Sequence, residues 1–83
     1  MKGVVINEMG RTTALATVYL KDMRGHRLRM KQTDRSGRFS FGLVNIDSDY
    51  EIYAEQASLL SKKLLIPSGE PRHDIVVTLI LKK

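Results

Sequence analysis

The 83-residue chain contains no cysteine and no tryptophan, and it has only two prolines. Without cysteine there is neither a disulfide framework nor a thiolate metal site, and catalysis by a cysteine nucleophile is excluded. Stability must therefore come from packing and strand pairing. A chain of this length buries only about 60–65% of the surface that it exposes when unfolded, so any core must be compact.

Long apolar runs are also missing. No segment approaches the roughly 20 consecutive apolar residues of a membrane-spanning helix, so the sequence predicts no membrane span. The apolar run at Val4 ends at Asn7, too early for a signal peptide. There is no internal repeat, low-complexity tract or linker, and we expect a single domain over residues 1–83.

Acidic residues are scarce in the first half of the chain. Residues 1–41 carry nine Lys and Arg against three Asp and Glu, whereas residues 42–83 carry five against six. Two interpretations remain open. The cations form a patch for an acidic partner such as a polyanion or a cell-surface glycan, or they are the solvated side of one hairpin, where they discourage edge-to-edge aggregation. The candidate contact residues are Arg27, Arg29, Lys31 and Arg38.

Aromatic residues are few, and their positions argue against nucleic acid. Base stacking over a sheet needs exposed aromatic rings between the basic residues. Phe39 and Phe41 alternate with basic and polar residues and so point to the opposite face of a strand. We therefore expect no specific nucleic-acid partner. The candidate aromatic contacts for a sugar or a peptide are Tyr19 and Tyr53, and alternation places Tyr53 on an outer face.

Alternation of apolar and polar residues, with short turn signals between segments, predicts an all-β sandwich or barrel. The expected strands are residues 3–7, 14–21, 27–32, 38–44, 50–55, 62–66 and 73–81. Residues 57–65 do not alternate, and one or two helical turns are the alternative there.

Two of these strands carry more specific expectations. In residues 27–32, Leu28 and Met30 are expected to face the core, while Arg27, Arg29 and Lys31 face outward. The last strand is apolar on both faces, so we expect it to be central or to have its outer face covered. The same apolarity predicts a possible homodimer through edge strands.

The segment from Thr33 to Phe41 is the most informative. Asp34 can hydrogen-bond the backbone just beyond it, and Gly37 can adopt the positive φ that ends such a turn. Phe39 and Phe41 then share one face of the next strand. This pattern predicts a buried hairpin, which is a structural feature and not a site.

The sequence predicts no catalytic or metal site. A nucleophile needs a base within reach and a group that orients the base, and only His26 and His73 are available as bases at neutral pH. We expect both at the surface. Asn45-x-Asp47-x-Asp49 copies three ligand positions of a calcium loop, but the turn glycine is missing, which favours a capped corner. We predict a non-enzyme without cofactor or metal.

In their order and spacing, these elements resemble the carboxypeptidase regulatory-like domain. The similarity rests on Gly3-x-Val5-x-Asn7-x-x-Gly10, Ala16-x-Val18-x-Leu20, Thr33-Asp34-x-x-Gly37-x-Phe39-x-Phe41 and Tyr50-x-Ile52-x-Ala54. It implies a prealbumin-like (transthyretin-like), Ig-like antiparallel Greek-key β-sandwich of about seven strands.

The resemblance also implies a function. Members of this family are mostly non-catalytic structural or binding modules, and small single-domain bacterial members are secreted, which implies a secreted or periplasmic location. A polyanion- or glycan-binding module that uses the basic hairpin is the first alternative. A transthyretin-like hydrolase is the second, but that enzyme ends in Tyr-Arg-Gly-Ser, whereas this sequence ends in Leu81-Lys82-Lys83.

Overall fold

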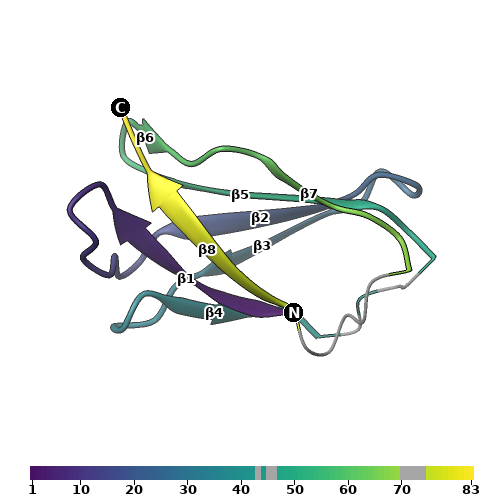
Figure 1. Cartoon of the computed structure of the whole chain (residues 1–83), viewed down its shortest axis with the longest axis horizontal. Coiled ribbons are helices and arrows are strands. Elements are labelled where there is room, and N and C mark those ends of the chain that lie inside the picture. The colour runs from purple at the N-terminus through teal and green to yellow at the C-terminus, as the bar shows by residue number, and fades with distance from the viewer. Residues whose placement is uncertain (43, 45–46, 70–74) are drawn as a thin grey trace.

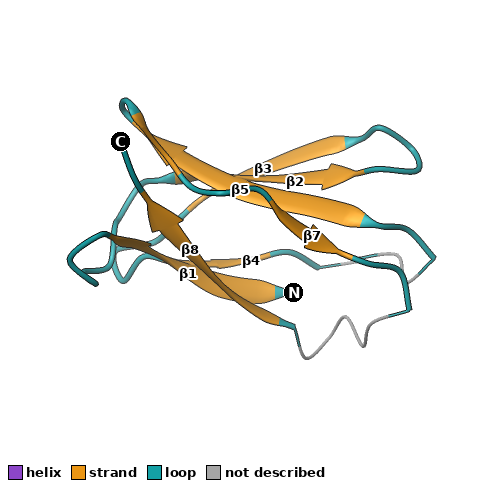
Figure 2. Cartoon of the chain, turned by 45° about the horizontal axis from the view of Figure 1, so that its top comes forward, coloured by secondary structure: helices purple, strands orange, loops and turns teal. Residues whose placement is uncertain are grey.

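Two β-sheets pack face to face (Figure 1, Figure 2). The computed structural model describes residues 1–42, 44, 47–69 and 75–83. One sheet has three strands in the order β4-β1-β8, and the other has five, in the order β3-β2-β5-β6 with β7 also paired to β5. The predicted all-β sandwich is confirmed.

The described residues form eight strands where about seven were expected. They are β1 (Lys2–Asn7), β2 (Thr17–Asp22), β3 (Leu28–Gln32), β4 (Arg38–Ser40), β5 (Tyr50–Gln56), β6 (Leu59–Leu60), β7 (Leu64–Ile66) and β8 (Val76–Leu81). The additional strand is β6, which lies where helical turns were the alternative. Ala57 has a φ of 54° in the turn that leads from β5 into β6, and the helical alternative is therefore wrong.

The first and last strands, β1 and β8, pair in parallel from Lys2↔Val76 to Asn7↔Leu81. The other strand pairs are antiparallel. The expectation of a purely antiparallel sandwich is therefore wrong at this pair. Parallel neighbours need a crossover connection, and the strands of the other sheet lie within it. The Greek-key order stays a prediction.

The last strand, β8, lies at an edge of the three-stranded sheet and not at its centre. Val77 and Leu79 face the core, whereas Val76 and Ile80 are 66% and 41% exposed. Of the two expectations for this strand, the central position is wrong. A covered outer face stays a prediction, since Val76 and Ile80 form an exposed apolar row in the single chain. Among the described residues there is no helix of the length and apolarity needed to cross a membrane.

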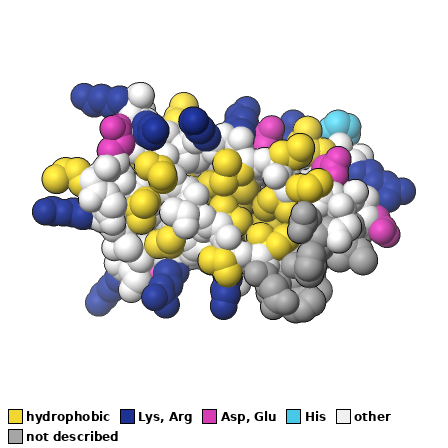
Figure 3. All heavy atoms as spheres, in the orientation of Figure 1, with side chains coloured by type: hydrophobic (Ala, Val, Ile, Leu, Met, Phe, Trp, Pro, Cys, Tyr) yellow, Lys and Arg dark blue, Asp and Glu magenta, His cyan; other side chains and the backbone are white. Residues whose placement is uncertain are grey.

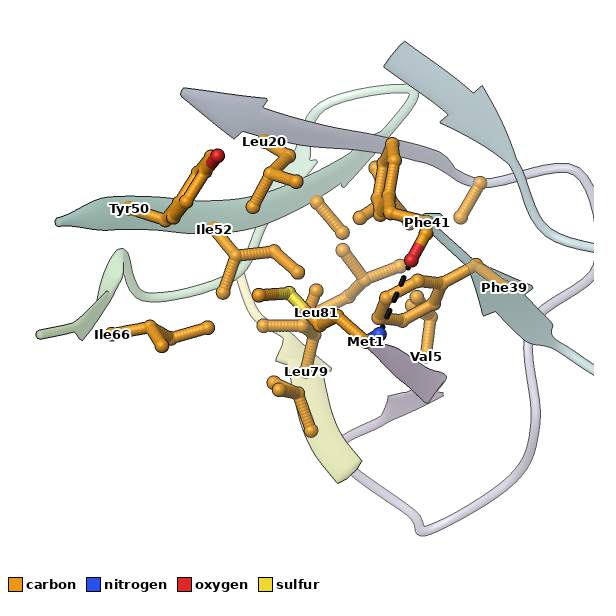
Figure 4. Packing of buried hydrophobic residues seen from close by; sticks show 14 residues of the cluster. Met1, Val5, Leu20, Phe39, Phe41, Tyr50, Ile52, Ile66, Leu79 and Leu81 are labelled. Carbon is orange, nitrogen blue, oxygen red and sulfur yellow. Dashed lines mark hydrogen bonds between the residues drawn. The ribbon is translucent and has the colours of Figure 1, made fainter. Parts of the chain in front are cut away.

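The core lies between the two sheets and draws on both (Figure 4). Leu20 and Ile52 from the five-stranded sheet and Leu79 from the other sheet belong to one buried cluster, and all three are at most 1% exposed. Phe39 and Phe41 are 5% and 3% exposed, and their rings meet edge to face with centroids 6.0 Å apart. The predicted burial of this aromatic pair is confirmed.

The turn between β3 and β4 forms as predicted. Asp34 Oδ1 accepts hydrogen bonds from the main-chain N–H of Ser36 and of Arg38, at 2.8 and 3.0 Å. Gly37 has a φ of 73°, and a Cβ there would lie 2.9 Å from both Thr13 N and Val5 O. Glycine is therefore required both for its conformation and for close approach.

Thr33, just before this turn, anchors the end of β3. It is 2% exposed; its hydroxyl donates to Thr13 O at 2.7 Å and accepts from Ala16 N at 3.0 Å. These bonds fix Thr33 on the inner side of the sheet. Because side chains alternate along a strand, Lys31 and Arg29 must then share that side.

The predicted orientation of β3 is accordingly wrong. Leu28 and Met30 are 52% and 64% exposed. Arg29 and Lys31 instead stand opposite the buried residues Leu20 and Val18 of β2. Clean alternation defined two faces but could not say which one is inner; the buried Thr33 decides it.

Candidate anion-binding groove

A basic groove runs along β4, between the end of β3 and the outer face of β1. Its lining comes from both ends of the chain and from the turn between β3 and β4. Dark blue Lys and Arg side chains project along the lower edge of Figure 3, where Figure 1 places β4. The charged groups among its described lining residues are Lys2, Lys31, Asp34, Arg35 and Arg38.

Lys31 reaches the groove by crossing from one sheet to the other. Its Nζ donates to the carbonyl oxygen of Ser40 at 2.7 Å, which satisfies an edge carbonyl of β4. An ammonium has three N–H donors, so Lys31 keeps two for a ligand. The inward orientation of β3 thus places a cation at the groove instead of on the opposite face of the sheet.

Arg35 and Arg38 flank the groove on the β4 side. Arg38 stands opposite Val4 in the β1–β4 register, and its main-chain carbonyl accepts from Asp34 N at 3.0 Å. The Asp34 carboxylate also lines the groove, and its Oδ1 is bonded to the main chain of the turn. Four cations face this one carboxylate, so the groove carries a positive charge.

The structure divides the four predicted basic contacts. Lys31 and Arg38 come together in the groove. Arg29 is half-buried, and its guanidinium lies 5.3 Å from the centre of the Phe41 ring, so it covers the core as a cation–π partner. Arg27 is exposed beside the turn before β3, where its carbonyl accepts from Asp22 N at 2.8 Å.

Lys2 and Arg35 are groove residues that the sequence analysis did not select. Lys2 is the first residue of β1, which lies between β4 and β8 in the three-stranded sheet. It pairs with Ser40 of β4 and with Val76 of β8. No local sequence pattern predicts this pairing between distant strands. Arg35 did have a signal, since it lies inside the Asp34 to Gly37 turn, which a hairpin necessarily presents to solvent.

Tyr19 and Tyr53 lie outside the groove, on the outer face of the five-stranded sheet. Their rings stack with centroids 4.9 Å apart and planes 18° apart. Lys63 Nζ lies over the Tyr53 ring, 5.2 Å from its centre. Tyr19 approaches from β2 on one side of β5, and Lys63 approaches from just before β7 on the other side. Protein groups therefore occupy both faces of the Tyr53 ring, which does not favour stacking with a sugar.

The tyrosine pair is also held by a carboxylate. The Tyr19 hydroxyl donates to Glu55 Oε1. This hydrogen bond, with smaller contributions from desolvation and from the negative charge of Glu55, raises the pKa of Tyr19 above its usual value. Tyr19 is thus fixed as a hydrogen-bond donor.

The remaining candidates for catalysis or metal binding do not gather into a site. His26 is exposed with a φ of 57°, while His73 lies outside the described residues. Asn45 of the calcium-like pattern also lies outside them, and Asp49 Oδ1 accepts from Ser68 N at 2.6 Å, which joins it to the segment after β7 instead of to the local backbone. Within the described ranges, no group of three or more His, Asp or Glu could hold a metal ion.

The turn that carries His26 is capped by Asp22. Its Oδ1 accepts from Arg24 N at 2.9 Å and from Gly25 N at 3.2 Å. Desolvation acts to raise the pKa of Asp22, but these two bonds, a bond from Ser48 and the charge of Arg24 outweigh it and lower the pKa below the usual value. The Asp22 carboxylate therefore stabilises the turn by accepting main-chain hydrogen bonds.

Comparison with known proteins adds no family assignment, since no protein-family model matches the sequence and no curated protein shows significant similarity to it.

Proposed function

We propose that this chain is a non-catalytic binding module that takes an anionic polymer, bearing phosphate or sulfate groups, in the basic groove along β4. The observation that carries the proposal is the convergence of Lys31 from one sheet and Arg38 from the other, with Lys2 and Arg35 beside them. These four residues come from two separate segments of the sequence, the first strand and the hairpin over residues 31–38.

The form of the groove favours a polymer over a small anion. The cations are solvent-exposed, so each contributes weakly alone, and a ligand with several charges gains from them together. Val4 and Val76 also line the groove, which gives apolar contact between the charges. A chain with regularly spaced anionic groups on a less polar backbone fits this lining.

The resemblance to carboxypeptidase regulatory-like domains supports the non-catalytic part of the proposal. That resemblance also supports a secreted or periplasmic location.

The test measures binding of fluorescently labelled ligands by anisotropy. The probes are a sulfated oligosaccharide, inorganic polyphosphate and a neutral oligosaccharide, at salt concentrations from about 50 to 200 mM. We expect binding of one or both anionic probes, with affinity falling steeply as salt rises because bound counterions are released. The neutral probe should not bind.

Two matched double variants locate the site. Arg35→Ala/Arg38→Ala removes two charges from the groove, whereas Lys62→Ala/Lys83→Ala removes two exposed charges outside it. The groove variant should lower the slope of log affinity against log salt by about 2, and the control should leave affinity nearly unchanged. Equal losses in both variants, or no anionic binding at low salt, would contradict the proposal.

A further inference from the structure

The outer face of the five-stranded sheet is a second surface, distinct from the groove. In Figure 2 the three-stranded sheet covers one side of β3, β2 and β5, and the described chain leaves the other side open. Residues of these strands form three rows across the sheet, one residue from each strand. The rows are Leu28–Lys21–Glu51, Met30–Tyr19–Tyr53 and Gln32–Thr17–Glu55.

Large apolar side chains lie along the two opposite edges of this outer face. Leu28 and Met30 on β3 are 52% and 64% exposed, and Leu60 and Leu65 beyond β5 are 55% and 65% exposed. Leu65 pairs with Glu51 and so extends the first row. An exposed apolar surface of this kind, with tyrosine and methionine near its centre, is typical of a protein interface.

Its charge differs from that of the groove. Lys21 and Lys63 are balanced by Glu51 and Glu55, although the chain as a whole has a net charge of +5. A polyanion gains no net attraction from this face. A partner that presents one carboxylate opposite each lysine, and apolar groups opposite the leucines, would fit it.

We propose that this partner is a second copy of the chain, with the two five-stranded sheets packed face to face about a two-fold axis. The axis lies in the interface between the two copies, parallel to β2 and β5 and above the line midway between these strands. Such an axis exchanges the positions of β2 and β5. Sheets pack in this way at about 10 Å separation with their strands nearly aligned. A two-fold interface must also be complementary to itself.

The cross-strand register supplies that complementarity. Lys21 and Glu51 are directly paired on neighbouring strands, so the axis places Lys21 opposite the partner's Glu51, and Glu51 opposite the partner's Lys21. Tyr19 likewise comes to face the partner's Tyr53. At the two ends of the first row, Leu28 comes to face the partner's Leu65.

The other two-fold axis in the plane of the face does not give this match. An axis perpendicular to the strands and over the middle row, Met30–Tyr19–Tyr53, would keep each strand over its own copy and reverse its direction. Glu51 would then lie opposite the partner's Glu55, which brings like charges together in a partly buried interface. Charge complementarity therefore selects both the second copy and its orientation.

The centre of the face is already rigid in the single chain. Tyr19 is held by its stack on Tyr53 and by its hydrogen bond to Glu55, and Lys63 lies over the Tyr53 ring. Little side-chain entropy remains to be lost when a partner covers these rings. Ordered aromatic side chains near the middle of an interface are the residues that usually carry its affinity.

Sedimentation of the unmodified chain over a range of concentrations is the first test, and we expect a concentration-dependent dimer. Lys21→Glu and Glu51→Lys should each weaken the dimer about tenfold or more, because each variant opposes like charges at both contacts. An equimolar mixture of the two variants should dimerise about as well as the unmodified chain, since every contact in the mixed pair joins opposite charges.

The mixture separates this interface from effects within one chain. Lys21 and Glu51 are also neighbours inside a single chain, so each variant is checked by thermal melting; mixing cannot repair a fold but can repair an interface. Ile80→Glu places a charge on the exposed row of edge strand β8 and serves as the control for dimers formed there. We expect it to dimerise normally.

Several results would overturn the inference. A monomer at all concentrations, dimerisation of both variants at the affinity of the unmodified chain, or no recovery in the mixture would each do so. Loss of the dimer in Ile80→Glu alone would instead assign self-association to the β8 edge. The anion-binding test does not depend on any of these outcomes.

Discussion

The edge strands β3 and β4 lie on either side of one turn and share an alternating pattern of residues. They nevertheless place their apolar side chains on opposite sides, inward in β4 and outward in β3. Both alternate cations or polar residues with apolar ones. In β4 the apolar Phe39 is buried and Arg38 faces outward, as the pattern suggests. In β3 the apolar Met30 is exposed while Lys31 shares the inner side with Thr33.

The difference shows that alternation defines two faces without saying which is inner. For β4 the choice is set by its pairing with β1, which brings Phe39 against Gly3: a Cβ at Gly3 would lie 2.6 Å from the Phe39 ring. For β3 it is set by the buried hydroxyl of Thr33. Because the inner side of β3 reaches β4 rather than the centre of the core, long cationic side chains are tolerated there.

The largest expected effect tests burial on the two strands directly. Phe39→Ala should lower the free energy of unfolding by about 3–5 kcal/mol, because it leaves a cavity in the core. Met30→Ala on β3 should change it by no more than about 0.5 kcal/mol, because that side chain is exposed. Chemical denaturation measures both. Similar losses in the two variants would contradict the assigned faces.

The turn that joins the two strands gives the next largest effect. Gly37→Ala must keep a positive φ and place a Cβ 2.9 Å from two main-chain atoms, so we expect a loss of about 2–4 kcal/mol. Gly10→Ala is the matched control: its φ is 80°, but a Cβ there has open space. Its loss should stay near 1–2 kcal/mol, or about the cost of φ alone. Equal losses would remove close packing from the account.

Two arginines of the same segment sharpen the comparison further. Arg29→Ala removes the guanidinium that lies over Phe41 and should cost about 1 kcal/mol. Arg27→Ala, at an exposed position, should stay within about 0.5 kcal/mol. Thermal and chemical denaturation of the pair gives the answer. A larger loss of stability in Arg27→Ala than in Arg29→Ala would contradict the assignment of Arg29 as the arginine that covers the core.

The smallest expected effect concerns the tyrosine pair beside β3. The pKa of Tyr19 is raised mainly by its hydrogen bond to Glu55, so this bond contributes fully below the usual tyrosine pKa of about 10 and is lost as pH rises through the raised value. Glu55→Gln should shift one tyrosine transition toward lower pH in an ultraviolet titration. An unchanged titration would contradict the assigned bond.

Local patterns predicted much of the fold. The Asp34 to Gly37 turn, the burial of Phe39 and Phe41, and the outer position of Tyr53 follow from turn chemistry and alternation within a few residues. The parallel pairing of β1 with β8 did not, because pairing between the two ends of a chain leaves no local signal.

The candidate site was predictable only in part, for the same reason. Lys31 and Arg38 were selected because they lie in the basic segment. Lys2 joins them only through the pairing of β1 with β4, and Arg29 leaves the set because it covers Phe41. The sequence does show a threonine, Thr33, just before the turn. Assigning Thr33 to the inner side would have oriented β3 correctly, since Thr33 lies two residues from Lys31.

The most direct measurement is an NMR titration of the isotope-labelled chain with the anionic probe that binds best, at low and at high salt. The account predicts salt-sensitive shifts that gather at Lys2, Lys31, Arg35 and Arg38, on both sheets at once. Shifts centred on Arg24 and Arg27, or spread evenly over the cations, would contradict the claim that the inward side of β3 and the outward side of β4 form one anion-binding groove.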